Sequence, residues 1–265
     1  MIPYFYVSTF HLGPLALQTW GLVVSIGAAV GIFFAHKRAK RFGLDPNPIL
    51  DWSFWALISA FVGARFFHVF FYDWSYYGSN PSDIIKFWQG GMSSFGGFSG
   101  ALIASFIYGW TLIRKKQVSW EKILRYADII MYWFPLGWGI GRIGCFLTHM
   151  HPGRLSSLPI AVAYPGGSRL DMGLTESFFA LLIFGLFVIL SRRKYWHGFY
   201  LVMFLIIYGA GRFMLDFNRA TDLVMSDARY LGLTPAQIGS LTFVIGGLYL
   251  WSLFRKPAVV GLAKT

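Results

Sequence analysis

Several ionisable residues stand inside otherwise apolar stretches, and the sequence singles them out for their chemistry. They are Arg65, His68, Asp128, Arg142, Glu176, Arg212 and Asp216. A charged side chain at the centre of a bilayer costs about 2.5 to 3.5 kcal/mol on insertion scales, so such a group normally faces a partner, water or the interior of a helical bundle. We therefore expect these groups to be compensated by one another or by a ligand.

Arg212 and Asp216 are spaced i, i+4, which places them on one face of a helix. An internal salt bridge is the simplest interpretation of that spacing. The alternative brings in Arg142, Arg65 and Glu176 from other apolar segments. Guanidinium groups that converge offer paired donors that match a phosphate monoester or diester. Lipid head groups supply such a phosphate, so the alternative is a site for an anionic phospholipid.

Two glycine-rich stretches accompany these charges. They are residues 90–100, with Ser94, Gly96 and Gly97, and residues 137–145, with Gly141. Small residues let helices pack closely, which is the simpler interpretation, and they also let a ligand approach the backbone. The first stretch is expected to begin a helix, where free N–H groups could bind an anion.

Cys145, His149 and His151 place three possible transition-metal ligands close together in the chain. A fourth ligand is not evident nearby, so we predict no metal and no cofactor. A histidine at the boundary between lipid and water is better suited to act as a general base or to contact a phosphate, because its unperturbed pKa lies near neutrality. His149 and His151 are therefore candidate catalytic residues.

These residues would be held at membrane depth by transmembrane helices, and the apolar composition of the chain indicates such helices. Of the 265 residues, 56% are hydrophobic and 13% are charged, which is too apolar for a soluble domain. Apolar segments of suitable length run over residues 15–36, 49–72, 92–113, 127–147, 173–191, 198–216 and 234–254. We predict an all-α polytopic membrane protein, with residues 1–265 forming a single transmembrane domain of about seven helices.

The basic residues indicate the orientation of this bundle in the membrane. Most of the 23 lysines and arginines follow the first, third, fifth and seventh apolar segments. Basic connections face the cytoplasm, so we predict the N-terminus outside and the C-terminus in the cytoplasm. The same distribution accounts for the net charge of +12, so this charge does not indicate nucleic-acid binding. On the outer side we predict an interfacial arm at 74–91 and a small extracytoplasmic cap at 148–172. The ionisable groups gather in the outer half, whereas a transporter would need them through the full depth.

The motifs taken together resemble one known family. They are Gly63-Ala64-Arg65 with Phe71-Tyr72, Trp88-Gln89-Gly90-Gly91-Met92-Ser93 with Gly96-Gly97, Gly139-Ile140-Gly141-Arg142-Ile143-Gly144, Gly153-Arg154, Ala163-Tyr164-Pro165-Gly166, Glu176, and Tyr208-Gly209-Ala210-Gly211-Arg212 with Asp216 and Arg219. Over nearly the whole chain they resemble the bacterial prolipoprotein diacylglyceryl transferases, whose seven-helix fold has the same orientation.

The resemblance implies a multi-pass transferase of lipoprotein biosynthesis in the bacterial cytoplasmic (inner) membrane. Such an enzyme takes diacylglyceryl from phosphatidylglycerol, places it on the cysteine thiol of a prolipoprotein signal peptide and releases glycerol phosphate. Arg142 and Arg212 match family arginines that would serve the phosphate end. The phospholipid site that we predict comprises Arg65, Ser94, Gly96, Gly97, Gly141, Cys145, Gly153, Arg154, Glu176 and Asp216.

The sequence departs from the family pattern at the expected base. The family has a histidine immediately before Gly96-Gly97, and here that residue is Phe95. The family's asparagine three residues after Arg142 is Cys145 in this chain. A phenyl ring accepts no proton, so either His149 or His151 supplies the base. The alternative is a non-catalytic or differently catalytic phospholipid-binding paralogue.

Overall fold

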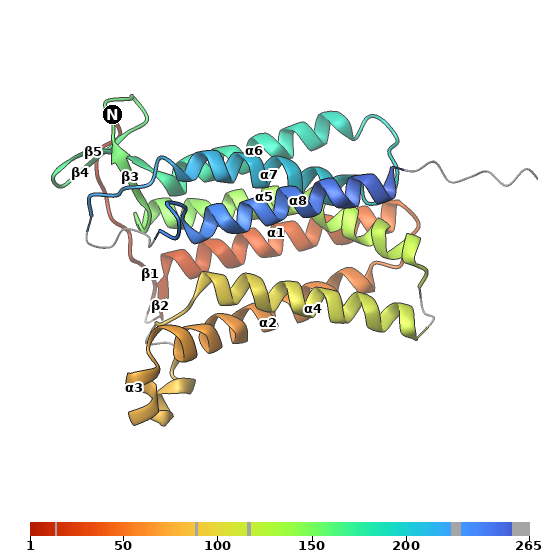
Figure 1. Ribbon diagram of the computed structural model, residues 1–265, viewed down its shortest axis with the longest axis horizontal. Helices are drawn as coiled ribbons and strands as arrows, with labels where there is room; N and C mark the ends of the chain where they lie inside the picture. The colour runs from red at the N-terminus through yellow and green to blue at the C-terminus, as the bar shows by residue number, and fades with distance from the viewer. Residues whose placement is uncertain (14, 88–89, 116–117, 224–228, 256–265) are drawn as a thin grey trace, which may run out of the picture. The chain divides into compact units, whose positions relative to one another are not determined.

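The computed structural model describes the chain except residues 14, 88–89, 116–117, 224–228 and 256–265, and the side chains of residues 12, 15 and 94. The motif residues Trp88 and Gln89 therefore lie outside the described residues. The chain divides into two compact units (Figure 1). The first unit comprises Met1–Ala35 and Ala127–Thr265, and the second comprises His36–Tyr126. The single-domain organisation expected from the sequence stays a prediction.

Helices account for most of the chain. They are α1 (Thr19–Arg41), α2 (Asn47–Phe67), α3 (Trp74–Ser79), α4 (Ser94–Arg114), α5 (Trp120–Leu147), α6 (Met172–Leu190), α7 (Phe199–Asp216) and α8 (Pro235–Phe254). Within the described residues, six helices are long and apolar enough to cross a membrane. This confirms the predicted polytopic helical fold. The remaining expected span, 127–147, lies within α5, a 28-residue helix with Pro135 in its interior.

Short strands add to the helices that the sequence predicts. β1 (Thr9–Leu12) pairs with β2 (Leu15–Gln18), so a strand stands where the first expected span begins. Gly13 adopts φ 60°, a left-handed conformation that suits the turn between these two strands. β3 (Pro152–Leu155), β4 (Val162–Tyr164) and β5 (Gly167–Asp171) form an antiparallel sheet in the order β3-β5-β4. This sheet lies in the stretch expected to form a cap.

In the first unit, α5, α6, α7 and α8 run alongside one another, and the β3-β5-β4 sheet lies at one end of them (Figure 1). The N-terminus joins that sheet through a bridge between Ile2 and Val162. The core of the unit is mainly aromatic and consists of Tyr132, Ile183, Phe187, Phe199, Tyr200, Phe204 and Tyr208. The first unit is thus a helical bundle with a small sheet at one end.

Polar side chains fix where the helices of this unit begin. The carboxylate of Asp128 accepts the backbone N–H groups of Gly198, Tyr200 and Leu201 at 2.7, 2.8 and 3.2 Å, and so caps α7. This contact gives one of the intramembrane charges a structural role. Two further caps start α6 and α8: Asp171 accepts the N–H of Leu174 at 3.1 Å, and Thr234 forms a capping box with Gln237.

In the second unit, α2 and α4 pack side by side (Figure 1). A Cβ atom added at Gly96 would overlap the carbonyl oxygen of Gly63 and the side chain of Phe67. Glycine at this position therefore lets the two helices approach closely. Beyond α2 the chain continues through a π-helical turn, His68–Tyr72, then α3, and then a 3-10 turn, Pro81–Ile85. The last two elements belong to the expected interfacial arm.

Candidate functional site

A cluster of charged side chains is buried in the first unit. Arg142 lies near the end of α5, Glu176 near the start of α6, and Arg212 and Asp216 in the last turns of α7. Arg142 Nη2 is 2.5 Å from Glu176 Oε2. Arg212 Nη1 is 3.2 Å from Glu176 Oε1 and 2.7 Å from Asp216 Oδ1. Because Glu176 is only 2% exposed and Asp216 is fully buried, these pairs interact in a medium of low dielectric constant.

Arg219 and Thr234 extend this cluster. Arg219 follows α7, and its Nε lies 2.9 Å from Asp216 Oδ1 while its Nη2 lies 3.9 Å from Glu176 Oε1. The hydroxyl of Thr234 donates a hydrogen bond to Asp216 Oδ2. Arg212 and Asp216 do form the ion pair that their spacing predicts, but as part of a larger network. Arg219 and Thr234 are not among the site residues predicted from the sequence.

Among the described residues, the cluster carries more positive than negative charge. Three guanidinium groups, those of Arg142, Arg212 and Arg219, face two carboxylates. Arg142 is 9% exposed, and among the described residues its Nε has no hydrogen-bond partner. A buried donor that lacks a partner costs about 1 to 3 kcal/mol. The excess charge and this donor both suit the binding of an anion.

Cys145 and His151 lie close to these arginines. Arg142 Nη1 donates to Cys145 Sγ at 3.4 Å. Burial, reinforced by the charges of Arg142, Arg219 and Arg212, lowers the pKa of His151 to about 3. His151 is therefore neutral at pH 7 and accepts a proton poorly, since a general base works best when its pKa lies near the working pH.

His149 lies in the turn after α5 and is held by the small sheet. Its φ of 43° is uncommon for a residue other than glycine. His149 Nδ1 is 2.8 Å from Asp171 Oδ2, and the hydroxyl of Tyr164 donates to the same oxygen at 2.6 Å. Asp171 thereby favours the tautomer with the proton on Nδ1, which leaves a lone pair on Nε2. Among the described residues, His149 Nε2 has no hydrogen-bond partner.

The surroundings of His149 are aromatic. The ring of Tyr4 stacks on the imidazole with centroids 4.8 Å apart, and the ring of Phe5 lies 5.1 Å away. Burial and the hydrogen bond to Asp171 raise the pKa of Tyr164, so its hydroxyl stays protonated and remains a donor. The sequence predicted His149 but not its partners Tyr164 and Asp171.

The expected site residues around β3 and in α5 have mixed surroundings. A Cβ atom added at Gly153 would lie 2.8 Å from the carbonyl oxygen of Asn218, so the lack of a side chain lets two backbones meet. A Cβ at Gly141 would make only an ordinary contact with Val24. Arg154 is exposed and donates its backbone N–H to Asn218 at 2.7 Å. Phosphate contacts by Gly141, Gly153 and Arg154 stay predictions.

Arg65 belongs to the second unit and is compensated differently. It lies near the end of α2 and is 7% exposed. Its nitrogen atoms donate to backbone carbonyl oxygens of Asp83 (2.5 Å), Ile84 (2.8 Å), Lys86 (3.4 Å), Gly90 (2.6 Å) and Gly91 (3.0 Å). Its guanidinium carbon also lies 5.0 Å from the centroid of the Tyr77 ring. Arg65 therefore ties the arm to α2, and its expected phosphate contact stays a prediction.

The start of α4 holds the remaining expected residues. Ser93 caps the helix by accepting the N–H of Gly96 at 3.3 Å, and the side chain of Ser94 lies outside the described residues. A Cβ at Gly97 would contact α2 at an ordinary distance. Phe95 is 54% exposed, and its ring lies 5.3 Å from that of Phe67. The expected ligand contacts of Ser94, Gly96 and Gly97 stay predictions.

Comparisons with known proteins bear on the whole chain. Residues 8–253 match the family model described as prolipoprotein diacylglyceryl transferase. A phosphatidylglycerol–prolipoprotein diacylglyceryl transferase of Pseudoalteromonas translucida is 34% identical over 268 residues, covering 95% of this chain and 96% of the relative. Enzymes of the same name from Chromohalobacter salexigens and Pseudomonas fluorescens are 32% and 31% identical, covering 93% and 100% of this chain and 91% and 100% of the relatives.

These matches confirm the resemblance drawn from the motifs, because they extend over nearly the full length of both partners in each comparison. They also agree with the multi-pass helical fold. The chain belongs to the prolipoprotein diacylglyceryl transferase family.

Proposed function

We propose that this protein transfers diacylglyceryl from phosphatidylglycerol to the cysteine thiol of a prolipoprotein signal peptide, in the bacterial cytoplasmic membrane. One observation carries the proposal: the buried cluster in which three guanidinium groups face two carboxylates. The relatives support the same substrates, since their names contain both phosphatidylglycerol and prolipoprotein.

The excess charge of the cluster suits the phosphate end of the reaction. The phosphodiester of phosphatidylglycerol carries one negative charge, which suits a cluster whose described residues include three guanidinium groups and two carboxylates. When the bond between the glyceryl carbon and the phosphate oxygen breaks, the departing glycerol phosphate gains further negative charge. Arg142, with its unpartnered Nε, is the group we assign to that phosphate, and Arg212 and Arg219 strengthen the field. Charge that develops in the transition state is then stabilised more than charge already present in the ground state.

The thiol end requires a base. The thiol gives its proton to that base, sulfur bonds to the glyceryl carbon, and glycerol phosphate leaves with the electron pair of the broken carbon–oxygen bond. We assign the base to His149 Nε2, because Asp171 holds Nδ1–H at 2.8 Å and orients the lone pair. His151 is the weaker candidate, since its pKa is lowered to about 3. The rings of Tyr4 and Phe5 lie against His149, so they must move aside when the peptide binds.

A second candidate function follows from Phe95. The family's histidine at this position is replaced by a side chain that accepts no proton, while the arginine cluster that suits a phosphate is present. A chain of this kind could bind an anionic phospholipid without transferring it. This alternative predicts that phosphatidylglycerol binds and that no thioether forms.

The decisive experiment uses the full-length protein in vesicles containing phosphatidylglycerol, with a lipoprotein signal peptide bearing one cysteine. We expect glycerol phosphate release in equal amount to the gain of diacylglyceryl mass on the peptide. His149→Gln should lower kcat about 100-fold or more, the range of a lost general base. His11→Gln, an exposed histidine in β1, is the matched control and should leave kcat unchanged.

Complementation of a strain depleted of its own transferase provides the test in cells. Growth with lipidated prolipoprotein supports the transferase proposal. A correctly inserted protein that retains phosphatidylglycerol in native mass spectrometry but transfers none would contradict it and support the second function. In that case Phe95→His should restore measurable transfer, because it returns the family's base.

A further inference from the structure

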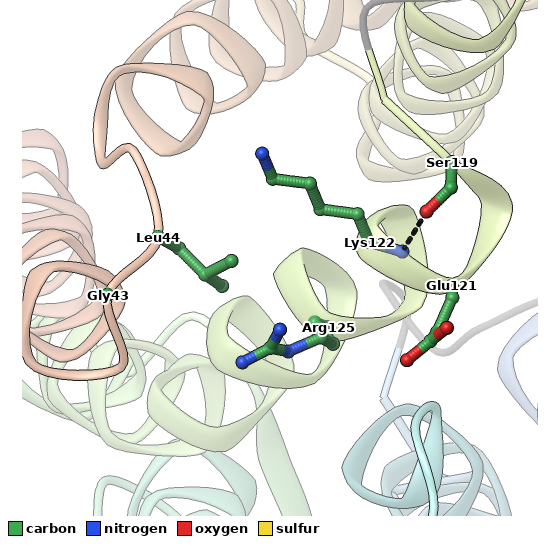
Figure 2. Close-up of a pocket in the computed structure, with 6 residues that line it drawn as sticks. All are labelled: Gly43, Leu44, Ser119, Glu121, Lys122 and Arg125. Carbon is green, nitrogen blue, oxygen red and sulfur yellow. Dashed lines mark hydrogen bonds between the residues drawn. The ribbon is translucent and has the colours of Figure 1, made fainter.

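A cavity in the second unit is lined by none of the residues assigned to transfer. It has a volume of about 370 Å³ and is lined by Gly43 and Leu44, which follow α1, and by Ser119, Glu121, Lys122 and Arg125 at the start of α5 (Figure 2). Leu44 is 7% exposed and forms an apolar part of the wall. The other lining residues are mainly polar. The cavity thus has a basic side, formed by Lys122 and Arg125, and an apolar side.

Two cations dominate this cavity. Lys122 and Arg125 are spaced i, i+3 on α5 and therefore share a face of the helix. Both are partly buried, and neither forms an ion pair with a carboxylate among the described residues. Figure 2 shows both side chains extending toward Leu44, while the carboxylate of Glu121 points in the opposite direction from the ammonium group of Lys122. Within the described part of the chain, the two cations thus face the cavity without an ion-paired carboxylate (Figure 2).

The position of the cavity in the chain indicates which leaflet it would serve. Its residues follow the first and third apolar segments, whose connections the basic residues assign to the cytoplasm. The cytoplasmic leaflet carries anionic lipids, and basic pockets between helices on that side bind phosphate-containing head groups. The apolar side formed by Leu44 suits the acyl chains of such a lipid.

We propose that this cavity is a second phosphate site, which binds the head group of an anionic phospholipid of the cytoplasmic leaflet through Lys122 and Arg125. No bond is made or broken at this site. It involves none of the residues proposed for transfer, so either proposal can fail without the other.

The test is a binding titration of the full-length protein in nonionic detergent. The probes are dihexanoyl phosphatidylglycerol, dihexanoyl phosphatidylcholine and inorganic phosphate, and native mass spectrometry counts the bound molecules. Lys122→Gln combined with Arg125→Gln should weaken one phosphatidylglycerol site about tenfold or more, the expected loss for two cations near a phosphate. The control, Arg114→Gln with Lys115→Gln, removes two exposed basic residues of the second unit that do not line the cavity.

Each outcome of the titration decides the proposal. Selective weakening of phosphatidylglycerol in the cavity variant alone supports it. If inorganic phosphate binds as tightly as the lipid and is lost with it, the site takes a free phosphate and the lipid assignment is overturned. Equal weakening in the control variant would indicate diffuse surface attraction, and unchanged binding in the cavity variant would indicate no site; both refute the proposal. Size-exclusion profiles and helical content of both variants establish that they are folded.

Discussion

Two buried arginine sites in this protein are compensated in different ways. In the first unit, Arg142 and its two neighbouring arginines share Glu176 and Asp216, and the cluster keeps an excess positive charge. In the second unit, Arg65 donates to five backbone carbonyl oxygens of one loop. The same residue type thus meets carboxylates in one unit and peptide dipoles in the other.

The difference separates a guanidinium that can serve a ligand from one that serves the fold. Carbonyl oxygens saturate the donors of Arg65 and fix the path of the arm, which leaves this residue little to offer a phosphate. The carboxylates around Arg142 leave its Nε without a partner among the described residues. An arginine at membrane depth is therefore a functional candidate when its donors and its charge are not both satisfied.

The largest expected effect is on kcat and follows from removing one guanidinium of the cluster in the first unit. Arg142→Gln should lower kcat of diacylglyceryl transfer about 100- to 1,000-fold, the range for losing one donor to a developing anion. It should leave the thermal unfolding temperature close to that of the wild type, because two arginines would then face two carboxylates. Arg142→Lys keeps the charge but not the forked donors, so its kcat should lie between those of Arg142→Gln and the wild type. Retention of kcat in Arg142→Gln within threefold would refute our assignment of the phosphate site.

Removing a carboxylate should instead destabilise the same cluster. Glu176→Gln raises the excess charge among buried groups, so we expect it to lower the free energy of unfolding by about 3 to 5 kcal/mol. Chemical unfolding in detergent measures this change. The matched control is Asp222→Asn, which removes a half-exposed partner of Arg169 and should cost far less stability than Glu176→Gln. Equal costs for the two variants would contradict the buried-cluster interpretation.

Substitution of Arg65 in the second unit should lower stability and leave phospholipid binding unchanged. Arg65→Lys loses the forked donors to the loop, and we expect a cost of about 2 to 4 kcal/mol, since hydrogen bonds to a charged group contribute about 1.5 to 3 kcal/mol each. Limited proteolysis should cleave within 83–91 faster, while the Kd for phosphatidylglycerol stays unchanged. A tenfold weaker Kd with unchanged stability would instead place Arg65 among the phosphate ligands.

The smallest effect measures the burial of His151 beside the arginines of the first site. Burial and the three arginines lower its pKa to about 3 from an unfolded value near 6.5. As the pH falls below 6.5, the unfolded chain takes up this proton before the folded chain does, so the contribution to stability is complete above that pH and declines below it. At pH 5 the loss should be about 1 to 2 kcal/mol. His151→Gln should remove this slope from the pH profile of unfolding, and an unchanged slope would contradict it.

The sequence predicted the parts of this protein that depend on local patterns. Apolar length identified six of the expected spans, because a bilayer imposes about 20 residues on each helix. Spacing identified the Arg212–Asp216 pair, because residues four apart share a helical face. The simpler interpretation of Gly96 also stands, since its neighbourhood in α2 and α4 leaves no room for a side chain.

The parts that the sequence did not predict depend on contacts between distant segments. Nothing local in the residues around Arg65 indicates that carbonyl groups of 83–86 and 90–91 fold back onto it. Tyr164 and Asp171 reach His149 only because β4 and β5 pair. Arg219 had a local signal, since it stands three residues after Asp216 and forms an ion pair with it. Thr234 had no local signal, because it lies at the start of another helix, α8.

The caps on α7 have a further, mechanical consequence. Asp128 holds the first N–H groups of this helix, and Thr234 and Arg219 hold Asp216 in its last turn. A helix fastened at both ends has a fixed register along its axis and a fixed rotation about it. Insertion of one residue between Gly198 and Arg212 would turn that guanidinium by about 100° relative to the capped start. The length of α7 thus sets the direction in which Arg212 presents its charge.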